Sequence, residues 1–214
     1  MLFSNSFYMN QSNNDGIVSE TSLNTFDLII CQGQNYWFSS LVEYFTKSPY
    51  SHVGIILRDP TDLNPELNGI YFLESGQESF PDAEDHLKKF GVQITDYDKW
   101  LSSYVGHVYV RRLKTQLDRA ELLHRFHEIH QTIHNKPYDV WAPDLIRCWL
   151  DLDVGNTQQT QRFFCSALVS YVYSQLGILP STLKWDLITP GYLASPELNI
   201  MTVRSQFGEL EKLK

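Results

Sequence analysis

The chain has 214 residues, of which 43% are hydrophobic and 14% aromatic, and its formal net charge is −8. A disordered chain would not carry so many aromatic residues, and the length fits one domain with extensions. The acidic balance argues against general affinity for phosphate backbones, so we expect no nucleic-acid partner. The three cysteines, Cys31, Cys148 and Cys165, are not paired at metal-ligand spacing, which disfavours a disulfide framework and favours a reducing compartment.

The N-terminal segment, residues 1–22, is rich in Ser and Asn and shows no hydrophobic period. It has neither the basic start nor the apolar run of a signal peptide, and no stretch approaches the ~20 apolar residues that cross a bilayer. We therefore expect a flexible N-terminal arm followed by a single domain over residues 23–214. The protein is expected in the cytoplasm, or in a host cytoplasm or virion if it is viral, without stable membrane insertion and not secreted.

Short β-branched and aromatic runs predict the strands in the first half of the chain. The expected elements are a strand at 26–33, a helix at 35–47, strands at 51–59 and 70–75, a short strand followed by a helical turn within 91–103, and a strand at 106–114. The loop before residue 70 is dense in Pro, Asn and Gly. The two strands that it joins are therefore expected to pair as a hairpin.

Helical spacing of apolar residues dominates the second half of the chain. A helix is expected at about 117–133, two prolines interrupt the pattern within 136–144, and a short apolar helix is expected near 145–150. The strongest helical stripe covers 163–176, and Gly177 is a good C-terminal stop. Strands flanked by helices without strict alternation predict an α+β fold, and no internal repeat or second domain is visible.

Cys165 lies in the first turn of that last helix. Unpaired N–H groups and the helix dipole favour negative charge there, which lowers a cysteine pKa and supplies donors for an oxyanion beside the sulfur. The competing interpretation is plain packing, because free cysteine is among the most buried residue types. The same interpretation applies to Cys31 and Cys148, which lie in apolar segments and are expected to be structural.

Two polar residues upstream complete a possible catalytic set. His52 opens the strand SHVGII, and Gly54 on the same face is expected to leave space beside the imidazole ring for another backbone or a ligand. Glu74 follows three large apolar residues near the end of the next strand. Each alone is more simply a satisfied or solvated side chain. Together with Cys165 they match the Cys–His–acid pattern of nucleophilic acyl transfer.

Five motifs occur in a characteristic order along the chain: FDLII (26–30), SHVGII (51–56), FLES (72–75), NKPYD (135–139) and FFCSALV (163–169). In this order they resemble the permuted papain-like cysteine hydrolases of the NlpC-type superfamily. The branch that they resemble most is the YiiX/YaeF-like group, with its relatives in large DNA viruses. The resemblance covers residues 26 to about 176 and implies a circularly permuted papain-like fold, in which an antiparallel sheet or barrel packs against helices.

The resemblance implies that Cys165 is the nucleophile, His52 the base and Glu74 the orienting acid. It implies a peptide, amide or lipid acyl substrate and no cofactor. It also makes a substrate-side position plausible for Tyr138 and Asp139, which otherwise read as turn residues. Two further substrate-binding candidates adjoin the catalytic residues: Tyr50, before the His strand, and Ser166, after the cysteine.

The sequence departs from the family pattern at two positions. Ala167 stands where the family often has Glu, which could alter a pocket or a helix contact. Phe26 stands where a Gly usually precedes the first strand, and we interpret that difference as structural.

Four histidines, His124, His127, His130 and His134, recur along the predicted helix at 117–133 and its C-terminal end. At 100° per residue all four fall within about 120° of one another, which could form a metal-binding face. A solvated or aromatic-packing face is the simpler interpretation, because such ligands need support from other elements. We therefore predict no metal site, while the question of this face stays open.

Two other functions compete with a cysteine amidase, peptidase or acyl hydrolase. One is a catalytically weak protein that uses the same cleft to bind a lipid or peptide, for example in a virion. The other is a lipid acyltransferase or phospholipase of the lecithin:retinol type, against which the residues around Cys165 count, since they lack the NCEHF-like pattern. No motif encodes the substrate or the oligomeric state.

Overall fold

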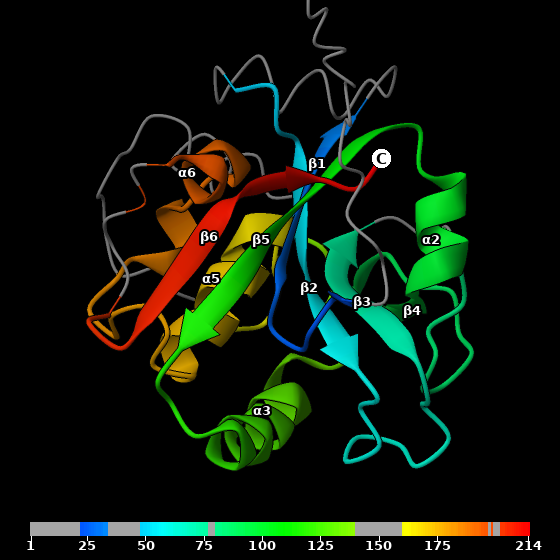
Figure 1. Ribbon diagram of the computed structural model, residues 1–214. Coiled ribbons are helices and arrows are strands. Elements are labelled where there is room, and N and C mark those ends of the chain that lie inside the picture. Colours follow the sequence, from blue (N-terminus) through cyan, green and yellow to red (C-terminus); the bar gives the residue numbers. More distant parts are fainter. Residues whose placement is uncertain (1–21, 34–47, 77–79, 140–159, 197, 199–201) are drawn as a thin grey trace, which may run out of the picture.

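The computed structural model describes residues 22–33, 48–76, 80–139, 160–196, 198 and 202–214. Within them, six strands form one antiparallel sheet in the order β4-β3-β2-β1-β5-β6 (Figure 1). The strands are β1 Leu28–Gly33, β2 His52–Arg58, β3 Ile70–Gly76, β4 Gly91–Asp96, β5 Gly106–Thr115 and β6 Ser205–Lys212. The helical elements are α2 Tyr97–Ser103, α3 Arg119–Ile133, α5 Cys165–Gln175, η2 Trp185–Leu187 and α6 Pro190–Ala194. The predicted α+β class and antiparallel sheet are confirmed.

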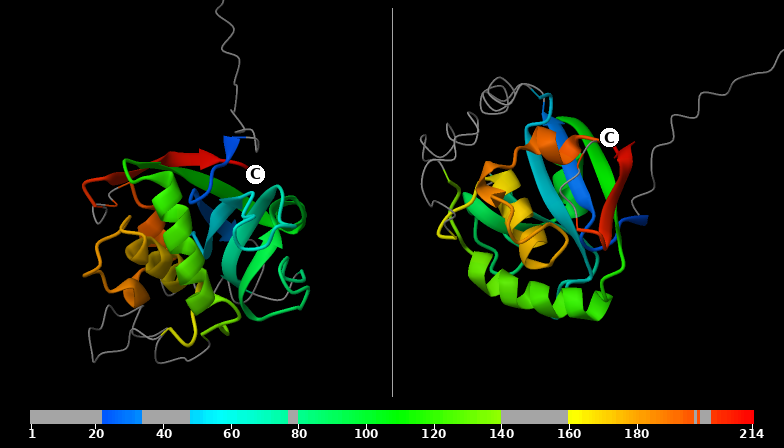
Figure 2. Two further views of the ribbon diagram at one scale, coloured as in Figure 1. Left: turned by 90° about the horizontal axis from the view of Figure 1, so that it is seen from below. Right: turned by 90° about the vertical axis from the view of Figure 1, so that its left-hand side faces the viewer.

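Strand β2 is buried on both faces, which explains its continuous apolar sequence. Ile55 belongs to a core cluster that includes residues of α3 and α5, whereas Ile56 belongs to a second cluster with residues of α2. Successive side chains of a strand point to opposite faces. The sheet is therefore a central layer, with α3 and α5 on one face and α2 on the other (Figure 2).

The strands predicted in the first half of the chain are all present, as is the helical turn at α2. The predicted hairpin is also confirmed, because β2 and β3 pair antiparallel with Ile55 opposite Leu73. The helix predicted at 35–47, the short helix near 145–150 and all of the N-terminal arm except Ser22 lie outside the described residues. None of the described helices is both long and apolar enough to cross a membrane.

The sequence patterns missed the C-terminal part of the sheet. Strand β6 reads SQFGELEK, and its burial does not follow a two-residue period. It pairs with β5 at the edge of the sheet, with a register shift between Arg111 and Leu113. Strand β6 lies at the edge of the sheet, and only Ser205 and Phe207 of its residues are buried. Most of its side chains can therefore be polar, so the alternation of apolar and polar residues that predicts a strand is weak.

Helix α5 is the most deeply buried helix of the described structure. All of its residues except Tyr171 and Gln175 are buried. It ends as predicted, since Gly177 adopts a positive φ of 75° and its N–H donates to the carbonyl of Ser174. Two hydroxyl groups fix its rotation about the axis: Ser166 donates to the carbonyl of Ile188, and Tyr173 donates to the carbonyl of Phe26.

Phe26 occupies a position where glycine would be the easier residue. Its φ is 73°, in the left-handed region that disfavours a side chain. The ring is buried and meets the ring of Phe126 edge-on, with a centroid distance of 5.5 Å. Phe26 therefore combines a conformational cost with aromatic packing against α3, which supports the structural interpretation of this departure from the family pattern.

Glycine should be tolerated better than alanine at position 26. Both Phe26→Gly and Phe26→Ala lose the ring, at a cost of about 3–5 kcal/mol. Glycine also relieves a left-handed conformation that costs about 1–2 kcal/mol. We expect the Gly variant to unfold at a higher urea concentration than the Ala variant. At Phe72, which lies within β3, the order should reverse, and the same order at both positions would contradict this account.

Candidate functional site

The three predicted catalytic residues lie at the ends of elements that meet. His52 is the first residue of β2, Glu74 lies two residues before the end of β3, and Cys165 is the first residue of α5. Helix α5 packs directly against β2 and β3. Cys165 is thereby brought to residues that precede it by 91 and 113 positions in the sequence, because a buried helix begins where these strands present their polar side chains.

Glu74 holds the imidazole of His52. The distance from His52 Nε2 to Glu74 Oε2 is 2.5 Å, and the two side chains are 19% and 6% exposed. The second carboxylate oxygen is also engaged, since Gln93 Nε2 donates to Glu74 Oε1 at 3.1 Å. Because Glu74 occupies Nε2, Nδ1 is the ring nitrogen that remains for the sulfur of Cys165.

The charge state of His52 follows from these neighbours. Burial by itself lowers the pKa of His52, but hydrogen bonds from Cys165 and Glu74 and the negative charge of both groups raise this pKa to about 10. A pKa in this range means that the imidazole is protonated at neutral pH. The imidazolium thus lies between the carboxylate of Glu74 and the sulfur of Cys165.

Cys165 combines low exposure with a favourable helix position. Its residue exposure is 5%. The N-cap residue Phe164 has an extended backbone and offers no side-chain cap to the first turn of α5. The side chain of the N-cap residue therefore does not occupy the N–H groups of that turn, and N–H groups beside a nucleophilic sulfur are the donors that an oxyanion hole uses.

The segment with Tyr138 and Asp139 pairs with the residues that directly precede Cys165. Tyr138 forms a parallel bridge with Phe163, and Asp139 Oδ1 pairs with Arg162 Nε at 3.1 Å. Burial, and next the charge of Cys165, raise the pKa of Tyr138 well above its usual range. Both residues are therefore near the predicted nucleophile, and both are buried.

The other two substrate-binding candidates differ in their surroundings. Tyr50 is half-buried and meets the ring of Tyr109 edge-on at 5.8 Å. Ser166 is 1% exposed, and its hydroxyl donates to the carbonyl of Ile188 at 2.6 Å. The side chain of Ser166 is committed to the core, so the structure gives it a packing role.

The space expected beside His52 is filled. A Cβ on Gly54 would lie 2.3 Å from the ring of Phe72, and that ring also meets the ring of His52 at 6.1 Å. The same Cβ would lie 2.6 Å from the backbone carbonyl oxygen of Leu73, so the neighbouring strand takes the room that was expected for another backbone or a ligand. Glycine is required there because an aromatic side chain of the neighbouring strand crosses over the backbone.

Three further residues, which were not predicted from the sequence, support the site. Gln93 binds Glu74, and the Ser75 hydroxyl donates to the carbonyl of Phe163 at 2.6 Å, which ties β3 to the segment before the nucleophile. A Cβ on Gly76 would lie 2.9 Å from Glu74 Oε2 and 3.5 Å from the ring of His52. The available signal was a polar residue, Gln93, between the buried apolar residues Val92 and Ile94 of β4.

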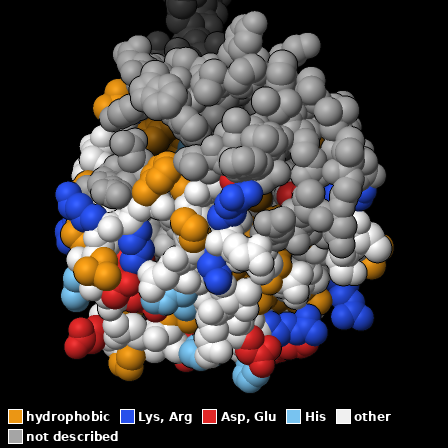
Figure 3. Space-filling view, turned by 180° about the vertical axis from the view of Figure 1, so that it is seen from behind, with side chains coloured by type: hydrophobic (Ala, Val, Ile, Leu, Met, Phe, Trp, Pro, Cys, Tyr) orange, Lys and Arg blue, Asp and Glu red, His pale blue; other side chains and the backbone are white. Residues whose placement is uncertain are grey.

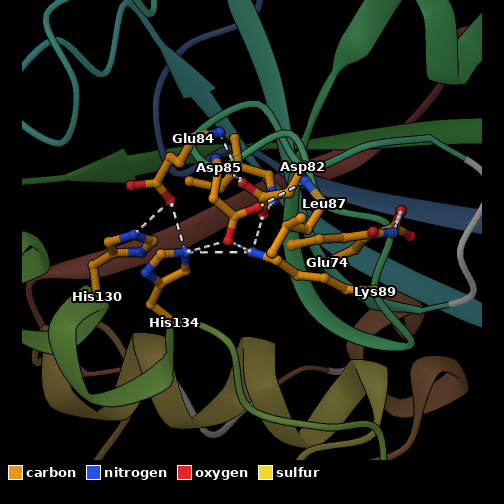
Figure 4. Close-up of polar contacts among 10 residues, drawn as sticks. Glu74, Asp82, Glu84, Asp85, Leu87, Lys89, His130 and His134 are labelled. Carbon is orange, nitrogen blue, oxygen red and sulfur yellow. Dashed lines mark hydrogen bonds and ion pairs between the residues drawn. The ribbon is translucent and has the colours of Figure 1, made fainter.

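The four histidines of the α3 region do not act as one face. His130 and His134 approach Glu84 in the loop before β4, at 2.8 Å and 3.6 Å (Figure 4). His124 is exposed, and His127 is half-exposed with Gln131 as its neighbour. The structure separates the four into an inward pair and an outward pair, because the loop that contains Glu84 packs against the C-terminal end of α3, where His130 and His134 lie.

Solved structures of similar fold exist. One of them is the crystal structure of the metalloprotein yiiX from Escherichia coli O157:H7, DUF1105, with 20% sequence identity and a TM-score of 0.47. The match covers 72% of this chain and 66% of the yiiX chain, so somewhat less than two thirds of that protein is matched. No protein-family model and no curated protein matches the sequence.

Removal of the Glu74 charge should lower the pKa of His52. In the wild type, the NMR signal of the His52 ring should titrate with a midpoint near 10, and in Glu74→Gln the midpoint should fall, because one of the two groups that raise this pKa is lost while Cys165 remains. The raised pKa contributes stability that is complete below pH 6.5 and is lost as the pH rises through about 10. The variant should therefore unfold more easily than the wild type at pH 6, and this difference should shrink above pH 10. A His52 midpoint that does not move would contradict the assigned pairing, and the exposed His124 is the control signal.

Proposed function

We propose that this protein is a cysteine hydrolase that cleaves an amide or acyl bond through a thioester intermediate. The observation that carries the proposal is the position of the His52 ring between the Glu74 carboxylate and Cys165, at the start of α5. Nucleophilic catalysis by a thiol needs a base within hydrogen-bond reach and a third group that orients this base. All three roles have a residue here.

In the proposed mechanism, His52 Nδ1 holds the proton of the Cys165 thiol. The thiolate attacks the substrate carbonyl carbon, a C–S bond forms, and the carbonyl oxygen becomes an oxyanion near the first-turn N–H groups of α5. The imidazolium then gives its proton to the leaving group as the amide or ester bond breaks. A water molecule, deprotonated by His52, attacks the thioester, and the acid product leaves with the thiol restored.

Glu74 acts by orientation and charge in this mechanism. Its contact with Nε2 selects the ring orientation that directs Nδ1 at the sulfur, and its negative charge stabilises the imidazolium. Gln93 fixes the carboxylate through the second oxygen and is thus a positioning residue. Buried surroundings strengthen these interactions relative to water.

A binding function on the same fold is the second candidate. It is favoured by the low exposure of Cys165, at 5%, which restricts access of a large substrate to the sulfur. Phe90, which is 43% exposed and stacks on Tyr138 at 4.8 Å, would offer such a protein an apolar contact near the same place. The two functions differ in turnover, so one experiment separates them.

Cys165→Ala should abolish turnover on at least one member of a panel of peptide, thioester and lipid-ester substrates. Loss of a nucleophile or its base costs about 10³-fold or more, so His52→Ala should be similarly inactive, and Glu74→Gln should lose less. Equal background rates for the wild type and Cys165→Ala across the whole panel would instead favour binding alone.

Iodoacetamide labelling gives a second measurement that needs no substrate. Mapped by mass spectrometry at pH 7, Cys165 should react faster in the folded wild type than in His52→Ala, because the imidazolium favours the thiolate. Cys31 is an internal control, since it is fully buried and burial raises its pKa well above the usual range. If Cys165 reacted no faster than in urea-unfolded protein, the proposed activation would be wrong.

A further inference from the structure

A second group of chemically active side chains lies away from Cys165. The loop at 81–89, between β3 and β4, faces the C-terminal half of α3 (Figure 4). The group, which we call the loop–helix cluster, consists of Asp82, Glu84, Asp85, Lys89, His130 and His134. The mechanism proposed for Cys165 uses none of them.

The loop side of the cluster is held by a buried carboxylate. Asp82 is 0% exposed, and its Oδ1 accepts the N–H groups of Glu84 and Asp85 at 2.8 Å and 3.4 Å. Its Oδ2 accepts the N–H of Ile94 in β4 at 3.0 Å. The backbone is therefore anchored to the sheet at the point where Glu84 and Asp85 extend toward the helix.

The helix side presents two imidazoles at the i, i+4 spacing. Their rings are stacked, with a centroid distance of 4.9 Å and an interplanar angle of 22°. His130 Nε2 lies 2.8 Å, and His134 Nε2 lies 3.6 Å, from Glu84 Oε2. Each of the three residues offers one ligand atom, and these three atoms all lie within 4.8 Å of one another. Tetrahedral Zn²⁺ sites place ligand atoms about 3.3 Å apart, so small side-chain shifts are sufficient.

Burial and charge favour a cation at this point. The side chains of His130, Glu84 and His134 are 7%, 12% and 28% exposed, which leaves one partly open side. Figure 3 shows histidine and acidic side chains close together at the α3 end of the molecule.

Lys89 neutralises only part of the cluster. Its ammonium lies 3.0 Å from Asp82 Oδ2, 2.7 Å from Asp85 Oδ2 and 3.4 Å from His134 Nε2, a contact that the lysine would give up when a metal ion binds that nitrogen. With neutral histidines, three carboxylates and one ammonium leave two negative charges within the loop–helix cluster, which is the charge of one divalent cation. The Nδ1 atom of His130 is buried and makes no hydrogen bond among the described residues, so the ring can present either nitrogen without losing another contact.

We propose that Glu84, His130 and His134 bind one divalent transition-metal ion such as Zn²⁺, which joins the C-terminal end of α3 to the loop before β4. Two histidines and one carboxylate form a ligand set that suits Zn²⁺, with a fourth position open to water or to Asp85. The proposal is independent of the hydrolase function.

The ion would stabilise a junction that also borders the catalytic site. Just beyond α3, the carbonyl of Lys136 accepts the N–H of Val92 in β4, and Tyr138 follows two residues later. On β4, Val92 precedes Gln93, which holds Glu74. The proposed role of the ion is therefore structural. Its removal should destabilise the contact between β4 and the segment that contains Tyr138.

The test is Zn²⁺ titration of the full chain carrying Cys165→Ala, so that the thiol cannot bind the metal. After chelator treatment, calorimetry at pH 7.5 should show one high-affinity Zn²⁺ per chain. Glu84→Gln and His134→Ala should each weaken this binding ~100-fold or more, since loss of even a supporting partner costs 10–100-fold. Lys89→Met should bind more tightly, because it removes a positive charge and frees Asp85.

The matched control is the double variant His124→Ala/His127→Ala, which removes the outward pair from the same helix. It should bind Zn²⁺ like the parent chain and gain the same increase in melting temperature on Zn²⁺ addition, whereas Glu84→Gln should gain none. Circular dichroism verifies that each variant is folded. Absence of binding in the parent chain, binding unchanged in Glu84→Gln and His134→Ala, or binding lost in the control would each overturn the proposal.

Discussion

The burial of helix α5 against strands β2 and β3 is the constraint on which the rest of the structure depends. The helix contacts apolar neighbours around most of its circumference, so it has few alternatives in rotation or position. Internal hydrogen bonds from Ser166 and Tyr173 remove the remaining freedom. A helix held in this way fixes its first residue, and the first residue is Cys165.

The same packing explains why a polar group can persist in this core. Glu74 is 6% exposed in its side chain, and an isolated carboxylate would be costly there. Its two oxygens meet Gln93 and His52, so the charge is both hydrogen-bonded and paired. The histidine in turn acquires a raised pKa from Glu74 and Cys165. A buried carboxylate therefore sets the electrostatics of the whole candidate site.

Strand β4 links the two sites described above. On one side Gln93 orients Glu74, and on the other Ile94 is bound by Asp82, the residue that anchors the loop–helix cluster. Stability at the α3 end and geometry at Cys165 are thus connected through two adjacent residues of one strand. The connection consists of two direct hydrogen bonds, from Gln93 to Glu74 and from the N–H of Ile94 to Asp82.

The sequence by itself determined the α+β class, the strands of the first half, the helix at Cys165 and its glycine stop. These features follow from local periodicity and from residues with strong backbone preferences, such as Gly177. The sequence also placed Cys165, His52 and Glu74 as candidates, since a thiol at a helix start and polar residues in apolar strands are local signals. It did not reveal β6, where an edge strand with mostly polar side chains gives no clear period.

Only the tertiary structure decided which side chains meet. The hydrogen bonds of Gln93 to Glu74 and of Ser75 to Phe163 depend on strand pairing and helix docking, which no local pattern encodes. The filled space above Gly54 likewise results from a ring on the neighbouring strand. The division of the four histidines into an inward and an outward pair required the position of the loop that contains Glu84. Periodicity specifies the face of an element, whereas long-range packing specifies what that face contacts.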